Sequence, residues 1–231
     1  MPTGRQALAA VAVGSTIYAM GGSFLAFDCS FDAVFESYST TANEWTSLEP
    51  MPVPRHGAAA AVVDGKIYLI GGENCSDGYV GPVSIYNPIT AEWSTGASLP
   101  TLRMLLTVAV LDGIIYAIGG LGNGLGTEVH AYDPDTDTWM EKAALPQWVN
   151  SASNVVLDGR ILVFGGENQQ YVAHEYDPTA DAWTTMENAP NRCNGTASGV
   201  FNGIAYWIGG NCIEGGEDSG GFTGLVYSYT P

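Results

Sequence analysis

The chain has 231 residues, of which 46% are hydrophobic and only 13% are charged. Seven Lys and Arg against 24 Asp and Glu give a formal net charge of −17, and such a surface repels phosphate backbones, so nucleic acid is a poor partner. No apolar run reaches the ~18 residues that a membrane helix needs, and the first residues do not resemble a signal peptide.

One unit recurs five times along the chain. Each unit begins with a strand rich in small residues, and we expect these innermost strands at residues 7–13, 57–63, 105–111, 151–157 and 195–201. A turn follows, such as Asp112-Gly113, whose residues tolerate positive φ. The second strand then ends at a pair of glycines: Gly21-Gly22, Gly71-Gly72, Gly119-Gly120, Gly165-Gly166 and Gly209-Gly210.

A third strand in each unit ends at a tyrosine: Tyr38, Tyr86, Tyr132, Tyr176 and Tyr229. In the first four units a tryptophan follows seven residues later: Trp45, Trp93, Trp139 and Trp183. Only the segment from the second glycine to the closing tyrosine varies in length, with 16, 14, 12, 10 and 19 residues in order. Repeat proteins place insertions on one face, often the binding face, so we expect these variable loops to form the functional face.

The glycine pair with its downstream Tyr and Trp resembles the kelch repeat, and the resemblance covers essentially the whole chain. It implies an all-β fold, a kelch-type β-propeller in which each repeat forms a four-stranded blade. We expect one domain over residues 1–231, with repeats at about 1–50, 51–98, 99–144, 145–188 and 189–231. Because Pro231 precedes the point where a Trp strand would follow, we expect the fifth blade to lack its outer strand and the chain to be an excerpt of a longer protein.

Four of the seven basic residues lie where the innermost strands begin. Arg5, Arg55 and Arg103 share one repeat position, Arg192 lies one residue before it, and Val149 interrupts the series in repeat four. Since guanidinium groups bind carboxylates in bidentate pairs, these residues predict an anion-binding mouth of the axial channel. The alternative is structural, with each arginine bridging backbone carbonyls of neighbouring loops.

Loop residues predict further ligand contacts, and the candidates are Phe24, His56, Asn74, Tyr79, Trp148 and Asn168. Exposed aromatic side chains supply the anchors that dominate binding energy, whereas aromatics packed onto the loops form small satellite cores, and both alternatives stay open. His130 and His174 are expected to face away from the axis. We therefore expect no metal and no other cofactor.

The predicted function is recognition, without catalysis, of a protein or of a small anionic ligand such as an acidic peptide. One alternative is a kelch-fold enzyme that acts on an acidic sugar, with Glu73 and Glu167 approaching the arginines, although this match is at the level of the fold alone. Another is the substrate-recognition half of a ubiquitin-ligase adaptor. We expect neither nucleic acid binding nor membrane insertion.

Two cysteines of repeat five predict a disulfide. With Asn202-Gly203 as the hairpin turn, Cys193 falls directly opposite Cys212 if no bulge intervenes. Opposed residues of an antiparallel pair have Cα atoms ~4.5–5.5 Å apart, which a disulfide accepts. A disulfide favours an extracellular or periplasmic location over the cytoplasm. The alternative is a pair of buried free thiols, and the pairing of Cys29 and Cys75 stays open.

Overall fold

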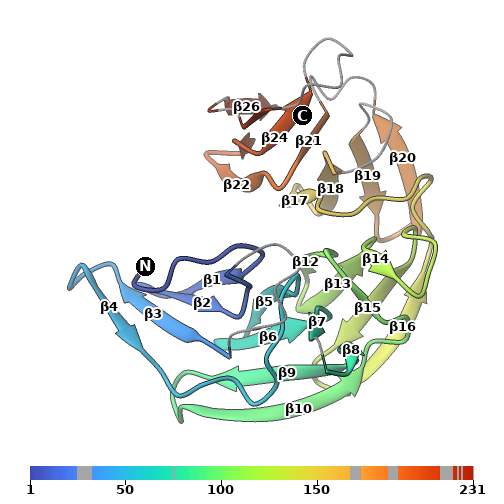
Figure 1. Cartoon of the computed structure of the whole chain (residues 1–231). Helices are drawn as coiled ribbons and strands as arrows, with labels where there is room; N and C mark the ends of the chain where they lie inside the picture. Colours follow the sequence, from blue (N-terminus) through green and yellow to red (C-terminus); the bar gives the residue numbers. More distant parts are fainter. Residues whose placement is uncertain are drawn as a thin grey trace. The chain divides into compact units, whose positions relative to one another are not determined.

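The computed structural model describes residues 1–24, 33–74, 76–166, 173–186, 192–213, 221–222, 224 and 226–230, with the backbone alone for 192, 212–213 and 221–222. All regular structure in these ranges is β-strand, as expected (Figure 1). Among them we find no helix with the length and apolar character needed to cross a membrane. The chain divides into two compact units, Met1–Met104 with Tyr132–Trp139, and Leu105–Ala131 with Met140–Pro231.

The first unit contains the sheets of repeats one and two. The first sheet has the order β1 (Ala9–Val13), β2 (Thr16–Met20), β3 (Phe35–Ser39), β4 (Glu44–Ser47). The second has the order β5 (Ala59–Val63), β6 (Lys66–Ile70), β9 (Pro82–Asn87), β10 (Glu92–Ser98). The short strands β7 (Glu73–Asn74) and β8 (Gly78–Tyr79) form a hairpin within the loop of repeat two, and β11 (Arg103–Met104) ends this part of the unit.

The remaining repeats form three further sheets. The third has the order β12 (Thr107–Leu111), β13 (Ile114–Ile118), β15 (Val129–Asp133), β16 (Thr138–Lys142), and β14 (Leu121–Gly122) lies in its loop. The fourth has the order β17 (Ser153–Leu157), β18 (Arg160–Phe164), β19 (Ala173–Asp177), β20 (Ala182–Met186). The fifth pairs β22 (Ala197–Phe201), β23 (Ile204–Ile208) and β26 (Val226–Tyr229), beside a small sheet of β21 (Arg192–Asn194), β24 (Asn211–Ile213) and β25 (Gly221–Phe222).

These five sheets, one per repeat, confirm the predicted blades, and the fifth has three strands within the described ranges. The innermost strands of neighbouring blades lie side by side, β1 against β5 in the first unit, and β12, β17 and β22 in succession in the second. Aliphatic and aromatic side chains fill the space between blades. Met20, Phe35 and Ile67 are fully buried in this way between the first two blades.

The innermost strands begin two residues later than expected. The residue at which each was expected to begin has a left-handed backbone instead, with φ of 52° at Ala7, 62° at Gly57, 54° at Leu105, 53° at Ser151 and 64° at Gly195. These bends also join neighbouring blades, since the Gly57 N–H donates to the Ala7 carbonyl at 2.9 Å. Ala, Leu and Ser have no preference for positive φ, so sequence patterns do not reveal the bend.

The glycine pairs tie each blade to the next one. The N–H of the second glycine donates to a backbone carbonyl at the Arg5-equivalent position of the following repeat: Gly22 to Arg55 at 3.0 Å, Gly72 to Arg103 at 3.1 Å, Gly120 to Val149 at 2.7 Å and Gly166 to Cys193 at 2.7 Å. A Cβ on the first glycine would clash with the same carbonyl, for example at 2.2 Å for Gly21. Glycine is therefore required here by a close approach of two backbones.

A second link, which we call the outer clamp, joins neighbouring blades near their outer strands. In the third blade, Asp137 Oδ1 accepts hydrogen bonds from the Tyr132 hydroxyl (2.6 Å) and from the Ala97 N–H of the preceding blade (2.6 Å). Trp139 Nε1 donates to the Ala97 carbonyl at 3.1 Å. The clamp recurs in the fourth blade with Asp181, Tyr176, Trp183 and Ala143.

The second blade lacks the outer clamp. Ala91 stands where the third and fourth blades have Asp137 and Asp181, so no carboxylate is present. Trp93 Nε1 is buried and has no hydrogen-bond partner among the described residues. Ala91 also adopts the left-handed conformation of its equivalents, with φ of 57°, although alanine tolerates it less well than aspartate does. Among the described residues, the junction between the first two blades therefore lacks contacts that the next two junctions have.

We expect Ala91→Asp to stabilise the protein, because aspartate tolerates this backbone and brings a carboxylate towards the Tyr86 hydroxyl. Ala91→Gly is the matched control, since it relieves the backbone without adding a carboxylate. The free energy of unfolding in urea should rise by about 1 kcal/mol for the glycine variant and by roughly 1 kcal/mol more for the aspartate variant. An aspartate variant no more stable than the glycine variant would show that the clamp does not form.

Candidate functional site

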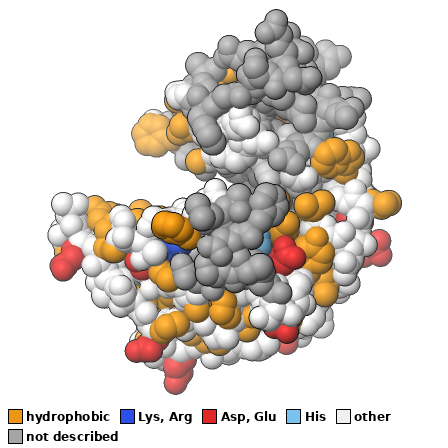
Figure 2. All heavy atoms as spheres, in the orientation of Figure 1, with side chains coloured by type: hydrophobic (Ala, Val, Ile, Leu, Met, Phe, Trp, Pro, Cys, Tyr) orange, Lys and Arg blue, Asp and Glu red, His pale blue; other side chains and the backbone are white. Residues whose placement is uncertain are grey.

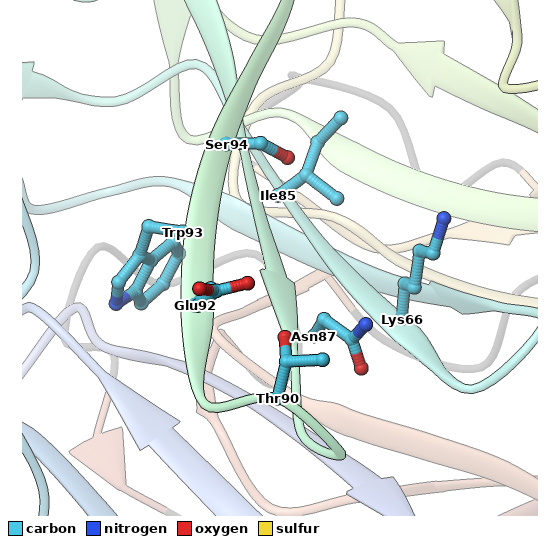
Figure 3. Close-up of a pocket in the computed structure, with 7 residues that line it drawn as sticks. All are labelled: Lys66, Ile85, Asn87, Thr90, Glu92, Trp93 and Ser94. Carbon is cyan, nitrogen blue, oxygen red and sulfur yellow. The ribbon is translucent and has the colours of Figure 1, made fainter.

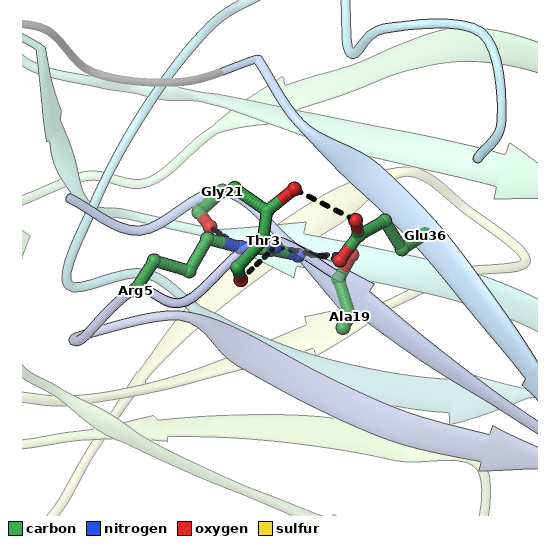
Figure 4. A network of polar contacts seen from close by, with 5 residues as sticks. All are labelled: Thr3, Arg5, Ala19, Gly21 and Glu36. Atoms are coloured by element: carbon green, nitrogen blue, oxygen red, sulfur yellow. Dashed lines mark hydrogen bonds and ion pairs between the residues drawn. The ribbon is translucent and has the colours of Figure 1, made fainter. Parts of the chain in front are cut away.

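Arg5 lies inside the first blade and binds its backbone. Its Nε donates to the Gly21 carbonyl at 2.6 Å, its Nη1 to the Thr3 carbonyl at 3.1 Å, and its Nη2 to the Ala19 carbonyl at 3.2 Å (Figure 4). Nη1 also forms an ion pair with Glu36 Oε2 at 2.7 Å, and the two side chains are 0% and 1% exposed. All three nitrogens of the guanidinium group are thus engaged within the blade.

Glu36 compensates the charge of Arg5. Burial alone would raise the pKa of the Glu36 carboxyl, but hydrogen bonds from Arg5 and Thr3, together with the Arg5 charge, outweigh it and lower the pKa below its ordinary value of 4.5. The Thr3 hydroxyl donates to the second carboxylate oxygen at 2.9 Å. The pair is therefore ionised at neutral pH and its oxygens are occupied by hydrogen bonds.

Arg55 occupies the same place in the second blade and is 1% exposed. Its guanidinium group donates to Ser84 Oγ at 2.8 Å, to the Gly71 carbonyl at 3.2 Å and to the Pro82 carbonyl at 3.4 Å. Burial lowers the pKa of Arg55 to about 10, so the group stays charged at neutral pH. Arg103 is likewise 1% exposed and donates to the Thr101 carbonyl at 2.7 Å.

The arginine position is buried in every repeat in which its side chain is described, whatever residue occupies it. Val149 and Cys193, which replace arginine in repeats four and five, are both 1% exposed. A position that accepts Arg, Val and Cys and is always buried serves packing. The structural alternative therefore accounts for Arg5, Arg55 and Arg103, and their burial does not support the predicted contact with an anion.

Two buried histidines lie at the Glu36-equivalent position of repeats three and four. His130 is 6% exposed and His174 is 0% exposed. Burial lowers the pKa of His174, and its Nε2 has no hydrogen-bond partner among the described residues, in the repeat where Val149 replaces arginine. Within the described ranges, no group of three or more His, Cys, Asp or Glu side chains is arranged to hold a metal ion.

Three of the predicted ligand contacts come together in the loop of the second blade. His56 and Glu73 exchange two backbone hydrogen bonds of 3.0 Å, and His56 Nδ1 lies 3.1 Å from the Glu73 carbonyl oxygen. Glu73 pairs with Tyr79 across the β7–β8 hairpin, and Tyr79 is partly exposed. The Asn74 Oδ1 accepts two N–H groups farther along the loop, at 3.0 and 2.8 Å. His56 and Asn74 thus use polar groups to shape this loop.

Large apolar side chains are exposed on the variable loops and on the links between blades. Phe24 is 64% exposed and Trp148 is 43% exposed, so for these two aromatics the exposed alternative holds. Leu121 and Leu125, at 47% and 83%, were not predicted as site residues. In the sequence, Leu125 stands between Gly124 and Gly126. A leucine between two glycines indicates an exposed loop position and not a buried strand position.

Several predicted residues lie outside the described part of the chain. They are Asn168 among the candidate contacts, Glu167 of the enzyme alternative, and Cys29 and Cys75. For Arg192 and Cys212 the backbone is described, in β21 and β24, and the side chain is not.

A pocket of about 360 Å³ lies at the other end of the second blade, away from the variable loops. Its lining residues flank the β5–β6 and β9–β10 turns: Lys66, Ile85, Asn87, Thr90, Glu92, Trp93 and Ser94. In Figure 3 the Trp93 ring lies on the opposite side of β10 from Ile85 and Lys66. Most of these residues are polar, whereas small-molecule pockets are mostly apolar, so we assign no ligand here.

Comparison with known proteins identifies relatives of this chain. The family model described as the KLHDC2/KLHL20/DRC7 Kelch-repeats domain matches residues 1–166. Kelch-like protein terF of Aspergillus terreus is 37% identical over 93 residues, which are 37% of this chain and 20% of that protein. Kelch-like protein 33 of Homo sapiens is 31% identical over 84 residues, 36% of this chain and 15% of that protein. The matched part is thus a fifth or less of these relatives' length.

The fold also matches a solved structure. The chain described as "Structure of YjhT" aligns with a TM-score of 0.84 at 19% sequence identity, over 99% of this chain and 83% of that chain. At this identity the likeness shows the fold alone, and together with the family match it confirms a kelch-type β-propeller.

The Arg5–Glu36 pair predicts a pH-dependent contribution to stability. Because the folded-state pKa of Glu36 is below the ordinary 4.5, this stability is fully present above about pH 4.5 and is lost as the pH falls through the folded-state pKa. At pH 7, Glu36→Gln should lower the free energy of unfolding by about 1.5–3 kcal/mol, since it leaves the buried guanidinium without a counter-charge. The difference from the unmodified chain should shrink in acid.

Glu44→Gln is the control, because Glu44 is exposed on β4 and its replacement should change stability little at any pH. Urea unfolding at several pH values measures both variants. A Glu36→Gln deficit that stays constant from pH 7 to pH 3 would contradict an ionised Glu36.

Proposed function

This chain belongs to the kelch-repeat family, and we propose that it is a recognition domain that binds a protein partner through the loop-bearing end of its blades. The observation that carries the proposal is the variable length of the loops at one end together with the large apolar side chains exposed there. The loops after the glycine pairs vary in length while the other spacings are constant, and they and the links between blades expose Phe24, Leu125 and Trp148. Exposed aromatic side chains of this kind supply much of the energy of protein binding.

Burial of the arginines argues against a small anionic ligand as the main target. The guanidinium groups of Arg5, Arg55 and Arg103 donate hydrogen bonds to groups of the blades themselves. Few of their N–H donors are therefore available to a ligand. An enzyme that acts on an acidic sugar would be favoured by a carboxyl of raised pKa beside accessible arginines. Glu36, which lies beside Arg5, has a lowered pKa instead. No described feature favours the catalytic alternative over recognition.

We expect peptides selected on the whole chain from a displayed library of random 12-residue sequences to bind the loop-bearing end. Hydrogen exchange of the complexes locates the contact. Protection should appear in residues 121–128, because this segment between the second and third strands carries the exposed Leu121 and Leu125. The β9–β10 turn around Ile89, which is 93% exposed at the other end of its blade, is the control region. Protection confined to that turn, or a selection without binders, would contradict the proposal.

We also propose that Cys193 and Cys212 form a disulfide. Strands β21 and β24 are antiparallel with Cys193 directly opposite Cys212, so the predicted register is confirmed. Cys193 is 1% exposed, at the position that arginine fills in the first three repeats. A cross-link would thus replace the bonds that a guanidinium group makes there, and it would favour an oxidising compartment.

Alkylation of the unfolded, unreduced chain tests the disulfide. At most two of the four cysteines should be labelled before reduction, and all four after it, as read by intact mass. In the control variant Cys193→Ser, the labelled set before reduction should include Cys212. Four labelled cysteines without reductant would remove both the disulfide and the argument for an oxidising compartment.

A further inference from the structure

Three exposed apolar side chains lie on neighbouring segments of the second unit, and we call them the Leu125 surface: Leu121, Leu125 and Trp148. Leu121 and Leu125 belong to the loop after Gly119-Gly120, and Trp148 belongs to the link from β16 to β17. The two segments are in contact, because the Val149 N–H donates to the Gly126 carbonyl at 3.0 Å. On the face shown in Figure 2, hydrophobic side chains gather over the region where Figure 1 draws β14.

The Glu128 side chain holds the loop that carries Leu125 in place. The Glu128 carboxylate accepts the backbone N–H of Leu125 (2.5 Å) and of Gly126 (2.9 Å). Glycine is favoured at Gly126, because its backbone has a φ of 78° and a Cβ there would lie 3.0 Å from the Gly120 carbonyl oxygen and 3.2 Å from the Trp148 Cβ. A loop held this way presents Leu125 without the entropy cost of ordering it on binding.

The charge of the whole chain is strongly negative, and few of its basic side chains are accessible and unpaired. Of the seven basic residues, Arg5, Arg55 and Arg103 are buried, and Arg160 is paired with Asp177. Lys66 is exposed, Lys142 on β16 is half-buried, and the Arg192 side chain lies outside the described residues. Little Lys or Arg is visible on the face in Figure 2, while Asp and Glu appear around its rim. A net charge of −17, with three of the five arginines buried, attracts cationic partners and repels acidic ones.

We propose that the Leu125 surface docks a protein segment that places an apolar side chain between Leu125 and Trp148 and flanks it with Lys or Arg. The proposal rests on the proposed recognition function and names the chemistry of the partner. Apolar contact supplies the affinity at the centre, while the net negative charge of the whole chain favours a cationic partner and speeds its approach. An acidic peptide, which arginines at the channel mouth would have favoured, is disfavoured because those arginines are buried.

The library peptides selected on the whole chain are the probe, and their sequences give the first readout. They should be enriched in Lys and Arg around one or two large apolar residues. Leu125→Ser and Trp148→Ala should each weaken binding of these peptides by at least about tenfold, as expected for a central anchor. Neither change should unfold the loop, because Leu125 is 83% exposed and alanine keeps the Cβ that packs on Gly126.

Ile89→Ser is the matched control, since it removes an exposed aliphatic side chain at the other end of a blade and leaves the charge unchanged. It should leave binding unaltered. Replacing the basic residues of a selected peptide with glutamine, or raising the salt concentration, should weaken binding several-fold.

Different outcomes separate the two proposals. Peptides that protect the loop-bearing end but are acidic, or that are insensitive to Leu125→Ser and Trp148→Ala, would overturn the docking surface and leave the recognition function standing. A selection without binders, or binders that protect only the turn around Ile89, would overturn both.

Discussion

The hydrogen bond between the second glycine of each pair and the backbone carbonyl of the next repeat is the contact on which the other features depend. It recurs from Gly22 to Arg55 and from Gly166 to Cys193, with lengths of 2.7–3.1 Å across the series. Because the carbonyl approaches so closely, the first glycine has no room for a Cβ. The residue that supplies the carbonyl is thereby held against the neighbouring blade, and its own side chain must turn into the blade interior.

That constraint explains why the arginine position is structural. An arginine can reach back to the glycine pair of its own blade, as Arg5 does to the Gly21 carbonyl and Arg55 to the Gly71 carbonyl. One residue thus receives a bond at its backbone from the preceding blade and gives one from its side chain to its own. The Val149 carbonyl still accepts the hydrogen bond from Gly120, but the valine side chain has no donor. In the same repeat, His174 occupies the Glu36-equivalent position, and its Nε2 therefore has no hydrogen-bond partner among the described residues.

The sequence was sufficient for features with a local cause. Asp112-Gly113 and the glycine pairs mark turns and close approaches wherever they occur, and counting residues from Asn202-Gly203 placed Cys193 opposite Cys212. It was insufficient where the cause lies in another repeat. Burial of Arg55 depends on carbonyls that residues up to 27 positions away bring together, and the left-handed bend at Leu105 accompanies a hydrogen bond from the Ser151 N–H of the next blade. Exposure of Leu125 follows from a Glu128 contact that no periodic pattern encodes.

These contacts explain why the blades share one structure while the loops between their second and third strands differ. The glycine pairs and outer clamps use their polar groups to join neighbouring blades, and the buried arginines use theirs within a blade, so these groups are not available to a ligand. What remains free to differ between repeats is the segment between the second glycine and the closing tyrosine, where a change of length disturbs none of those bonds. A kelch chain can therefore acquire an apolar side chain such as Leu125 in one loop without changing the contacts between blades, while its overall negative charge favours cationic partners. The proposed recognition would thus depend both on one loop held by Glu128 and on the charge of the whole chain.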